Sequence, residues 1–378
     1  MKRRKIEPNN GLTLSRLMSK LPTVGADFVK SILLRRITRP VPTVMQFNVT
    51  WKCNSRCIMC NIWDRNYSER ELNAFEFDTI LSDPLFRKIE CVLISGGEPT
   101  LRQDLFQITD VLWRRMPRLE KLILYTNGLN LKSISEQLPQ LIKFCNVRNI
   151  NVTVRVSLDG IDDLHDEIRG VPHAFDRAMK SIDFLKGIQS KLSFRFGIAS
   201  TISGKNVYAL RDIVSFCRER DIDGIFIMSW ISQNYYGNAS QKNELQIDST
   251  AKQFLINFLG DRIRESGVFK SDAYYYDKVI QMLRGETKRT MPCPFLHQGI
   301  VLDAFGNISF CTNSRKLGDV SHGKKPSDVF YNTKSTKYRK ILAQKICPTC
   351  ESSCLVGIGL EKEVISFIVF LMKRLYRY

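Results

Sequence analysis

Three cysteines in one short stretch constrain this 378-residue chain more than any other feature. They are spaced C-x3-C-x2-C at Cys53, Cys57 and Cys60, directly after an apolar stretch that alternates like a strand. Three thiolates at this spacing can each bind one iron of a cubane cluster and leave the fourth iron open to a small-molecule chelate. Zinc is the alternative, although zinc sites usually take four ligands and no fourth Cys or His lies close by. On these cysteines alone, a 4Fe-4S cluster and zinc both stay open.

The charge of the chain is unevenly distributed. Its formal net charge is +19, and residues 1–42 hold ten Lys and Arg residues against Glu7 and Asp27. A basic segment of this kind suits an anionic partner such as a phospholipid surface, a nucleic acid or an acidic peptide, and a solvated basic face is an equally good interpretation. The content of 43% hydrophobic and 25% charged residues is typical of a folded globular protein.

Cysteine usage and the apolar stretches indicate the compartment. Eight of the eleven cysteines fall into two clusters, which indicates metal ligation in a reducing compartment. The other three, Cys91, Cys145 and Cys217, are predicted to be buried, inert thiols. The longest apolar run, 364–372, is far shorter than the roughly 20 residues of a spanning helix, and we expect no signal peptide. These features predict a cytoplasmic protein, with peripheral contact at the inner membrane surface as an alternative.

Strand-like and helix-like stretches alternate through residues 43–240. This alternation predicts an α/β fold with a parallel sheet and right-handed crossovers. About six repeats predict a partial, TIM-like (β/α)6 barrel, because a complete barrel has eight. The predicted strands are 43–50, 90–95, 121–126, 152–158, 193–201 and 224–229, and the predicted helices lie near 73–82, 103–115, 132–144, 174–188 and 206–219.

Each unusual polar or glycine motif of this region follows the carboxyl end of a predicted strand. The cysteine triplet follows the first strand, and three further motifs follow the next three. In parallel α/β proteins this rim is where active sites are assembled. The three further motifs are Gly96-Gly97-Glu98-Pro99, Thr126-Asn127-Gly128 and Ser157-Leu158-Asp159-Gly160.

The rest of the chain divides into a connection, a second cysteine array and two termini. Residues 241–290 look helical at 247–263 and 274–283, and 291–358 form a small cysteine-rich domain. Its stretch 299–310 is a hairpin candidate with a glycine turn, which would bring Cys293 and Cys311 to neighbouring strand ends. Residues 1–42 form a basic amphipathic segment and 359–378 an apolar and basic tail. The array consists of Cys293, Cys311, Cys347, Cys350 and Cys354.

Over residues 43–356 these motifs resemble the radical S-adenosylmethionine (SAM) superfamily, in particular members with a C-terminal SPASM or twitch auxiliary-cluster domain. The resemblance implies that Cys53, Cys57 and Cys60 hold a 4Fe-4S cluster whose open iron is chelated by SAM. It also implies one auxiliary 4Fe-4S cluster on the second array, with one cysteine left over. The SAM contacts that it implies are Gly96, Gly97, Glu98, Asn127, Ser157, Asp159 and Arg169.

The same resemblance implies an activity. One electron from an external reductant would cleave SAM to a 5′-deoxyadenosyl radical, which removes a hydrogen atom from a peptide or other natural-product substrate. One alternative is a lipid or lipid-linked substrate at a membrane surface, because both termini are basic and apolar. A non-catalytic, metal-stabilised nucleic-acid-binding protein is a third hypothesis. It is disfavoured, because it does not explain a Gly-Gly-Glu beside three cysteines.

Three details of the site remain open from the sequence. Family members commonly have an aromatic residue before the last cysteine of the triplet, where this chain has Met59. Asp303 and Asp319 are candidate bases in the cysteine-rich domain, although the context of Asp319 is more typical of a turn. Arg169 could instead form a surface ion pair with Asp162, Asp163 or Asp166.

Overall fold

The computed structural model describes residues 40–64, 70–232, 235–265, 271–291, 293–352 and 368–372. The chain forms two compact units. The larger one, here called the barrel unit, comprises 41–254 and 295–352, and the second comprises 1–40, 255–294 and 353–378. The predicted N-terminal segment, most of the C-terminal tail and Cys354 therefore lie outside the described residues.

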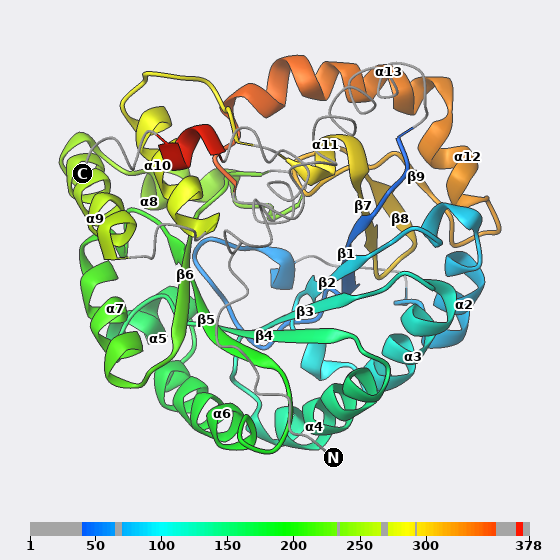
Figure 1. The fold of residues 1–378 in the computed structure, drawn as a ribbon, viewed down its shortest axis with the longest axis horizontal. Coiled ribbons are helices and arrows are strands. Elements are labelled where there is room, and N and C mark those ends of the chain that lie inside the picture. Colours follow the sequence, from blue (N-terminus) through cyan, green and yellow to red (C-terminus); the bar gives the residue numbers. More distant parts are fainter. Residues whose placement is uncertain are drawn as a thin grey trace. The chain divides into compact units, whose positions relative to one another are not determined.

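Six parallel strands form the inner layer of the barrel unit, and they pair in sequence order. Helices α2, α3, α4, α6 and α7 lie on the outer side of this curved sheet (Figure 1). The predicted six-repeat partial barrel is thus confirmed. The strands are β1 (Val44–Thr50), β2 (Cys91–Gly96), β3 (Lys121–Thr126), β4 (Asn151–Ser157), β5 (Arg195–Ile202) and β6 (Asp223–Met228), and the helices are α2 (Ala74–Leu81), α3 (Leu105–Arg115), α4 (Leu131–Val147), α5 (Asp163–Arg169), α6 (Ala174–Ile188), α7 (Leu210–Glu219) and α8 (Lys242–Leu245).

Burial explains why these segments become strands and helices. All residues of β1 except Gln46 are buried, as expected for a strand covered on both faces in a parallel sheet. The helices instead have one buried stripe, such as Ile134, Leu138 and Leu141 on α4. Helix α2 begins at a capping box in which Asn73 and Glu76 bond each other's backbone N–H groups.

A C-terminal hairpin extends the sheet beyond β1. Strand β7 (Gly299–Asp303) is parallel to β1 and places Asp303 opposite Asn48, and β8 (Asn307–Ser309) returns antiparallel to β7. The predicted hairpin is therefore confirmed, and it covers the edge of the barrel that a six-stranded array leaves open. Further elements are β9 (Gly318–Asp319), α11 (Pro294–Gln298), α12 (Pro326–Tyr331), α13 (Thr333–Ile341) and the short helical turns Ile62–Asp64, Pro84–Phe86, Pro99–Leu101, Val207–Ala209, Ala239–Gln241, Leu342–Ile346 and Cys347–Thr349.

The described part of the second unit is helical. It contains the end of α9 (Ser249–Glu265), α10 (Ser271–Leu283) and a helical turn at 368–372. The rings of Tyr274 and Phe370 pack edge to face with centroids 5.4 Å apart. Within the described ranges no helix combines the length and apolar character needed to cross a membrane. The predicted domain boundaries stay predictions.

Candidate active site

The cysteine loop begins where β1 ends and is fixed from one side by the Gly-Gly-Glu segment after β2. The backbone N–H of Gly97 donates to the Thr50 carbonyl at 2.6 Å, and that of Glu98 donates to the Lys52 carbonyl at 2.8 Å. Gly96 has a φ of +130°, which side chains disfavour, and a Cβ there would lie 2.1 Å from the Thr50 oxygen. The two glycines therefore allow one backbone to approach the other, directly beside the first cysteine.

Replacing Gly97 by alanine is expected to lower the free energy of unfolding by ~1–3 kcal/mol or more, because overpacking is costly. The added Cβ would lie 2.2 Å from the backbone oxygen of Lys52. The matched control is Gly187→Ala in α6, where a Cβ meets nothing within 4 Å. That change should instead stabilise the helix by roughly 0.5–1 kcal/mol. Urea unfolding of both variants checks the prediction, and equal stability would contradict it.

The Glu98 carboxylate connects the ends of β2 and β3. The side chain is 1% exposed, and its Oε1 accepts from Thr100 N at 3.1 Å and from the hydroxyls of Thr100 and Thr126 at 2.7 and 2.8 Å. Its Oε2 accepts from Asn127 N at 2.6 Å. Burial raises the pKa of Glu98, and these hydrogen bonds oppose the increase. Most of the hydrogen bonds that this carboxylate accepts therefore hold the ends of β2 and β3 together. Its predicted contact with the SAM ammonium group stays a prediction.

Asn127 brings the end of β3 to the cysteine loop. Its Nδ2 donates to Asn54 Oδ1 at 2.7 Å and lies 3.9 Å from Cys53 Sγ. Its Oδ1 accepts from Leu129 N at 2.9 Å, which fixes the orientation of the amide. The structure therefore brings Asn127 to the first cysteine, and Asn54 is a supporting residue that the sequence analysis missed.

Helix α5 fixes the cysteine loop from the other side. The backbone N–H groups of Arg56 and Ile58 donate to the carbonyls of Arg169 and Ile168 at 2.7 and 3.0 Å, where the helix ends. Gly170 follows with φ +60°, and a Cβ there would lie 2.5 Å from the Arg56 oxygen. A left-handed glycine after a helix is a common C-terminal cap. Here it also makes room for the cysteine loop.

Arg169 is buried and faces the thiols. Its Nη2 lies 2.6 Å from Asp159 Oδ2, and its Nη1 donates toward Cys57 Sγ at 3.5 Å. Burial lowers the pKa of Arg169, but the neighbouring Asp159 carboxylate and Cys57 thiol outweigh burial and raise it above the ordinary value. The alternative of a surface ion pair with Asp162, Asp163 or Asp166 is wrong, because Arg169 is only 7% exposed and its guanidinium pairs with Asp159.

Asp159 and Ser157 follow β4 at the same rim. Asp159 is fully buried, and its Oδ1 accepts from Thr201 N at 2.7 Å while Oδ2 pairs with Arg169. Both of its oxygens are therefore used inside the protein, which makes it a positioning residue for Arg169. Ser157 is half-buried at the end of β4. Its predicted contact with SAM, like that of Asp159, stays a prediction.

His165 has a structural environment. Its Nδ1 accepts from Asp159 N at 3.1 Å. Burial lowers the pKa of His165 to about 2, so the imidazole is neutral at physiological pH. It supports the turn that carries Asp159.

The loop after β6 holds the far end of the cysteine loop, which sequence reasoning missed. Asn238 is fully buried, and its Nδ2 donates to the Met59 carbonyl at 2.7 Å and to the Trp230 carbonyl at 3.0 Å. The backbone N–H of Asn61 donates to the Tyr236 carbonyl at 2.8 Å. Met59 occupies the position before the last cysteine of the triplet, where family members commonly have an aromatic residue. It is buried and packs with Cys57, Ile168 and Leu245. An isolated Asn in a polar loop gives no sequence signal for this role.

The donor set of the loop fits an iron–sulfur cluster. Burial raises the pKa of the Cys53 and Cys60 thiols to about 12, and a bound cationic metal centre would oppose this increase by stabilising their thiolates. The N–H groups of Asn127 and Arg169 point at Cys53 and Cys57, as outer donors to cluster sulfurs do. Among the described residues, no three Cys, His, Asp or Glu side chains converge on a point that could hold a single metal ion. A cubane differs, because each thiolate binds its own iron.

Three cysteines of the second array occupy one neighbourhood of the barrel unit. Asn313 Nδ2 donates toward Cys350 Sγ at 3.4 Å, and Cys350 N donates to the Cys347 carbonyl at 3.2 Å. Burial raises the pKa of Tyr338, and the neighbouring Cys311 and Cys347 act in the same direction. Cys293 belongs to the second unit, so its predicted pairing with Cys311 stays a prediction. Outside the two cysteine clusters, the thiols of Cys91, Cys145 and Cys217 are buried as predicted.

Comparison with known proteins places these features in a family. The family model described as "Radical SAM superfamily" matches residues 47–201. "Fe-coproporphyrin III synthase" of Methanosarcina barkeri is 26% identical over 261 residues, which cover 69% of this chain but only 59% of that protein. A "Probable GTP 3',8-cyclase" of Sulfurisphaera tokodaii is 27% identical over 299 residues, covering 79% of this chain and 84% of that protein.

A solved structure has a similar fold. Streptococcus suis SuiB, solved bound to S-adenosylmethionine, superposes with a TM-score of 0.57 at 16% identity, over 94% of this chain and 80% of that one. The span matched by the family model contains the cysteine triplet, the Gly-Gly-Glu segment and Arg169. With its three thiols at the rim of a partial (β/α)6 barrel, the chain contains a radical SAM domain over residues 47–201.

Proposed function

We propose that this protein cleaves SAM reductively and uses the resulting 5′-deoxyadenosyl radical to remove a hydrogen atom from an organic substrate. The observation that carries the proposal is the cysteine loop, held between the Gly-Gly-Glu segment and α5 with Arg169 facing Cys57. A site that only stabilises the fold has no need for a buried guanidinium beside a metal-binding thiol.

The residues divide into ligands and supports. Cys53, Cys57 and Cys60 would hold the 4Fe-4S cluster, and the chemistry that cluster and SAM supply together is reductive cleavage of the sulfonium. The Nε of Arg169 is buried and has no hydrogen-bond partner within the described part of the chain, so it remains a donor for the SAM carboxylate. Glu98 and Asn127 order the rim on which the nucleotide would lie.

The substrate and the second array belong to the same proposal. The auxiliary motif favours a peptide or other natural-product precursor, whereas the relatives' names refer to an iron coproporphyrin and to GTP. We propose that the substrate is either a peptide or other natural-product precursor, or a small organic molecule of the kind that the relatives' names give. The electron would come from an external one-electron reductant. Cys311, Cys347 and Cys350 would hold one auxiliary 4Fe-4S cluster, completed by one of the two remaining cysteines.

The test uses the wild-type protein, reconstituted anaerobically with iron and sulfide. With a chemical reductant and SAM, it should release methionine and 5′-deoxyadenosine in equal amounts, and added SAM should change the EPR spectrum of the reduced cluster. Tetrahedral zinc bound at the first three cysteines, or an EPR signal indifferent to SAM, would refute the proposal.

A further inference from the structure

Arg169 brings a positive charge to one thiol of the cysteine triplet. Its Nη1 donates toward Cys57 Sγ at 3.5 Å, and the two residues are only 7% and 8% exposed. The other side chains that contact these sulfurs within the described part of the chain are neutral. Ser55 Oγ lies 3.0 Å from Cys57 Sγ, and Asn127 Nδ2 lies 3.9 Å from Cys53 Sγ. The guanidinium therefore supplies the formal charge among these contacts.

Asp159 supplies the opposite charge on the other side of the guanidinium. Its Oδ2 lies 2.6 Å from Arg169 Nη2, and its Oδ1 accepts from Thr201 N at 2.7 Å. The carboxylate is fully buried, so solvent screens the pair much less than it would at the surface. One end of the guanidinium contacts the thiol of Cys57 and the other contacts the carboxylate. The pair is therefore a dipole whose positive end faces the thiol.

A buried charge beside a cluster ligand changes how easily the cluster is reduced. Reduction adds one electron, and therefore one negative charge, to the cluster and its thiolates. A nearby cation stabilises this reduced state and raises the reduction potential, whereas a nearby anion lowers the potential. Both effects are large in a buried site, because the effective dielectric constant is low. Arg169 without a counter-charge would therefore make the reduced cluster a weaker electron donor, and Asp159 opposes this effect.

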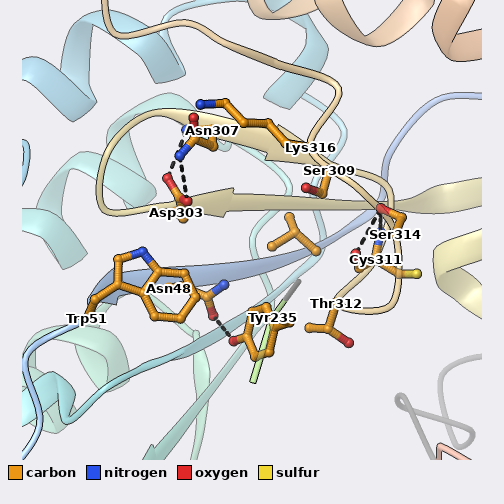
Figure 2. Close-up of a pocket in the computed structure, with 11 residues that line it drawn as sticks. Asn48, Trp51, Tyr235, Asp303, Asn307, Ser309, Cys311, Thr312, Ser314 and Lys316 are labelled. Atoms are coloured by element: carbon orange, nitrogen blue, oxygen red, sulfur yellow. Dashed lines mark hydrogen bonds between the residues drawn. The ribbon is translucent and has the colours of Figure 1, made fainter. Parts of the chain in front are cut away.

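Another side of the cysteine loop borders a cavity of about 220 Å³ (Figure 2). Trp51, which precedes the loop, and Tyr235 line this cavity, and Cys60 packs against the apolar cluster to which both rings belong. Lys316 lines the cavity as well, but its side chain is 52% exposed. Solvent screens an exposed charge much more than a buried one. Lys316 is therefore a cation of the same region that should leave the potential of the cluster unchanged.

We propose that Asp159 is the counter-charge that keeps the cluster on Cys53, Cys57 and Cys60 strongly reducing. It acts through Arg169, whose charge it offsets, and is therefore a positioning residue for the reaction. One electron enters from the external reductant, and the same electron breaks a carbon–sulfur bond of SAM to give methionine and the 5′-deoxyadenosyl radical. The inference rests on the proposed function for this cleavage step, whereas the reduction potential depends only on the cluster.

The test measures the reduction potential of the reconstituted full-length protein in the absence of SAM. The protein is titrated with titanium(III) citrate and redox mediators, and the reduced cluster is followed by EPR. SAM added at the end identifies the signal of this cluster, because the signal of an auxiliary cluster should not respond. The variants are Asp159→Asn and Asp159→Asn combined with Arg169→Met. The controls are Lys316→Met and Asp223→Asn, since the Asp223 carboxylate also faces an arginine, at 2.9 Å, but is 55% exposed.

Asp159→Asn should favour reduction by about tenfold, which is a rise of about 59 mV for one electron. The double variant should have a potential below that of wild type, because it lacks the cation nearest to the thiol. Both controls should match wild type. Once reduced, Asp159→Asn should release 5′-deoxyadenosine from SAM several-fold more slowly, since its cluster holds the electron more tightly. Easier reduction together with slower cleavage distinguishes a counter-charge from a structural support, because a damaged site would not become easier to reduce.

A reduction potential of Asp159→Asn that equals or lies below that of wild type would overturn the inference. If this variant takes up no cluster, as judged by its iron and sulfide content, the double variant provides the test. A potential of the double variant that equals or exceeds that of wild type would then overturn the inference. The expected shifts in potential without any cleavage of SAM by wild type would refute the proposed function alone.

Discussion

Replacing Cys57 by alanine is expected to reduce 5′-deoxyadenosine formation to the level of protein-free controls. Cys57 is the buried member of the triplet and the one that receives N–H donation from Arg169, at 3.5 Å. With only Cys53 and Cys60 left, a second iron would lose its protein ligand, and the cluster would lose the single open site on which SAM chelation depends. Iron and sulfide content and product release after anaerobic reconstitution measure the effect.

A matched cysteine control separates ligand loss from loss of structure. Cys145 is a fully buried thiol on α4. Cys145→Ala should therefore retain SAM cleavage in the folded fraction, although the cavity it leaves lowers stability. Cleavage that persists in Cys57→Ala would contradict the assignment of the triplet as cluster ligands. Equal loss of activity in both folded variants would contradict it too.

The second large effect is expected at the buried ion pair. Asp159→Asn keeps an oxygen for Thr201 N but removes the charge that faces Arg169, a residue that is only 7% exposed. Breaking a buried pair from one side typically costs ~3–5 kcal/mol, because the remaining charge is buried without compensation. Chemical denaturation should therefore show a loss of unfolding free energy of about that size.

The Arg155–Asp223 pair provides the matched control. Its two side chains meet at 2.9 Å, a similar distance, but the Asp223 side chain is 55% exposed. Exposed pairs are worth about 0–1 kcal/mol, so Asp223→Asn should change stability little. Adding Arg169→Met to Asp159→Asn should recover much of the loss, since it removes the uncompensated charge. If the two Asp→Asn variants prove equally stable, the buried pair does not stabilise the rim.

The sequence determined the framework of this protein. The alternation of apolar strands with amphipathic helices predicted all six parallel strands, and the hairpin at 299–310 was also predicted. Strands and helices depend on periodicities of two and 3.6 residues, which can be counted along the chain. The place of the motifs followed from the same pattern, because the carboxyl ends of parallel strands share one rim. The Cys53, Cys57 and Cys60 triplet could likewise be picked out as a candidate cluster site from its local spacing.

The tertiary structure alone decided which partners the polar side chains take. The predicted contacts of Gly96 and Gly97 with SAM stay predictions, and the close approach that only the fold revealed is to the backbone of Thr50 and Lys52. From the sequence, Arg169 could also have paired with Asp162, Asp163 or Asp166, whereas the fold pairs it with Asp159.

The hydrogen bond from the Asn238 side chain to the Met59 carbonyl has no sequence signature at all. A hydrogen bond between residues far apart in the chain is set by how strands register and loops close. That geometry has no period in the sequence, and it exists only once the sheet is assembled.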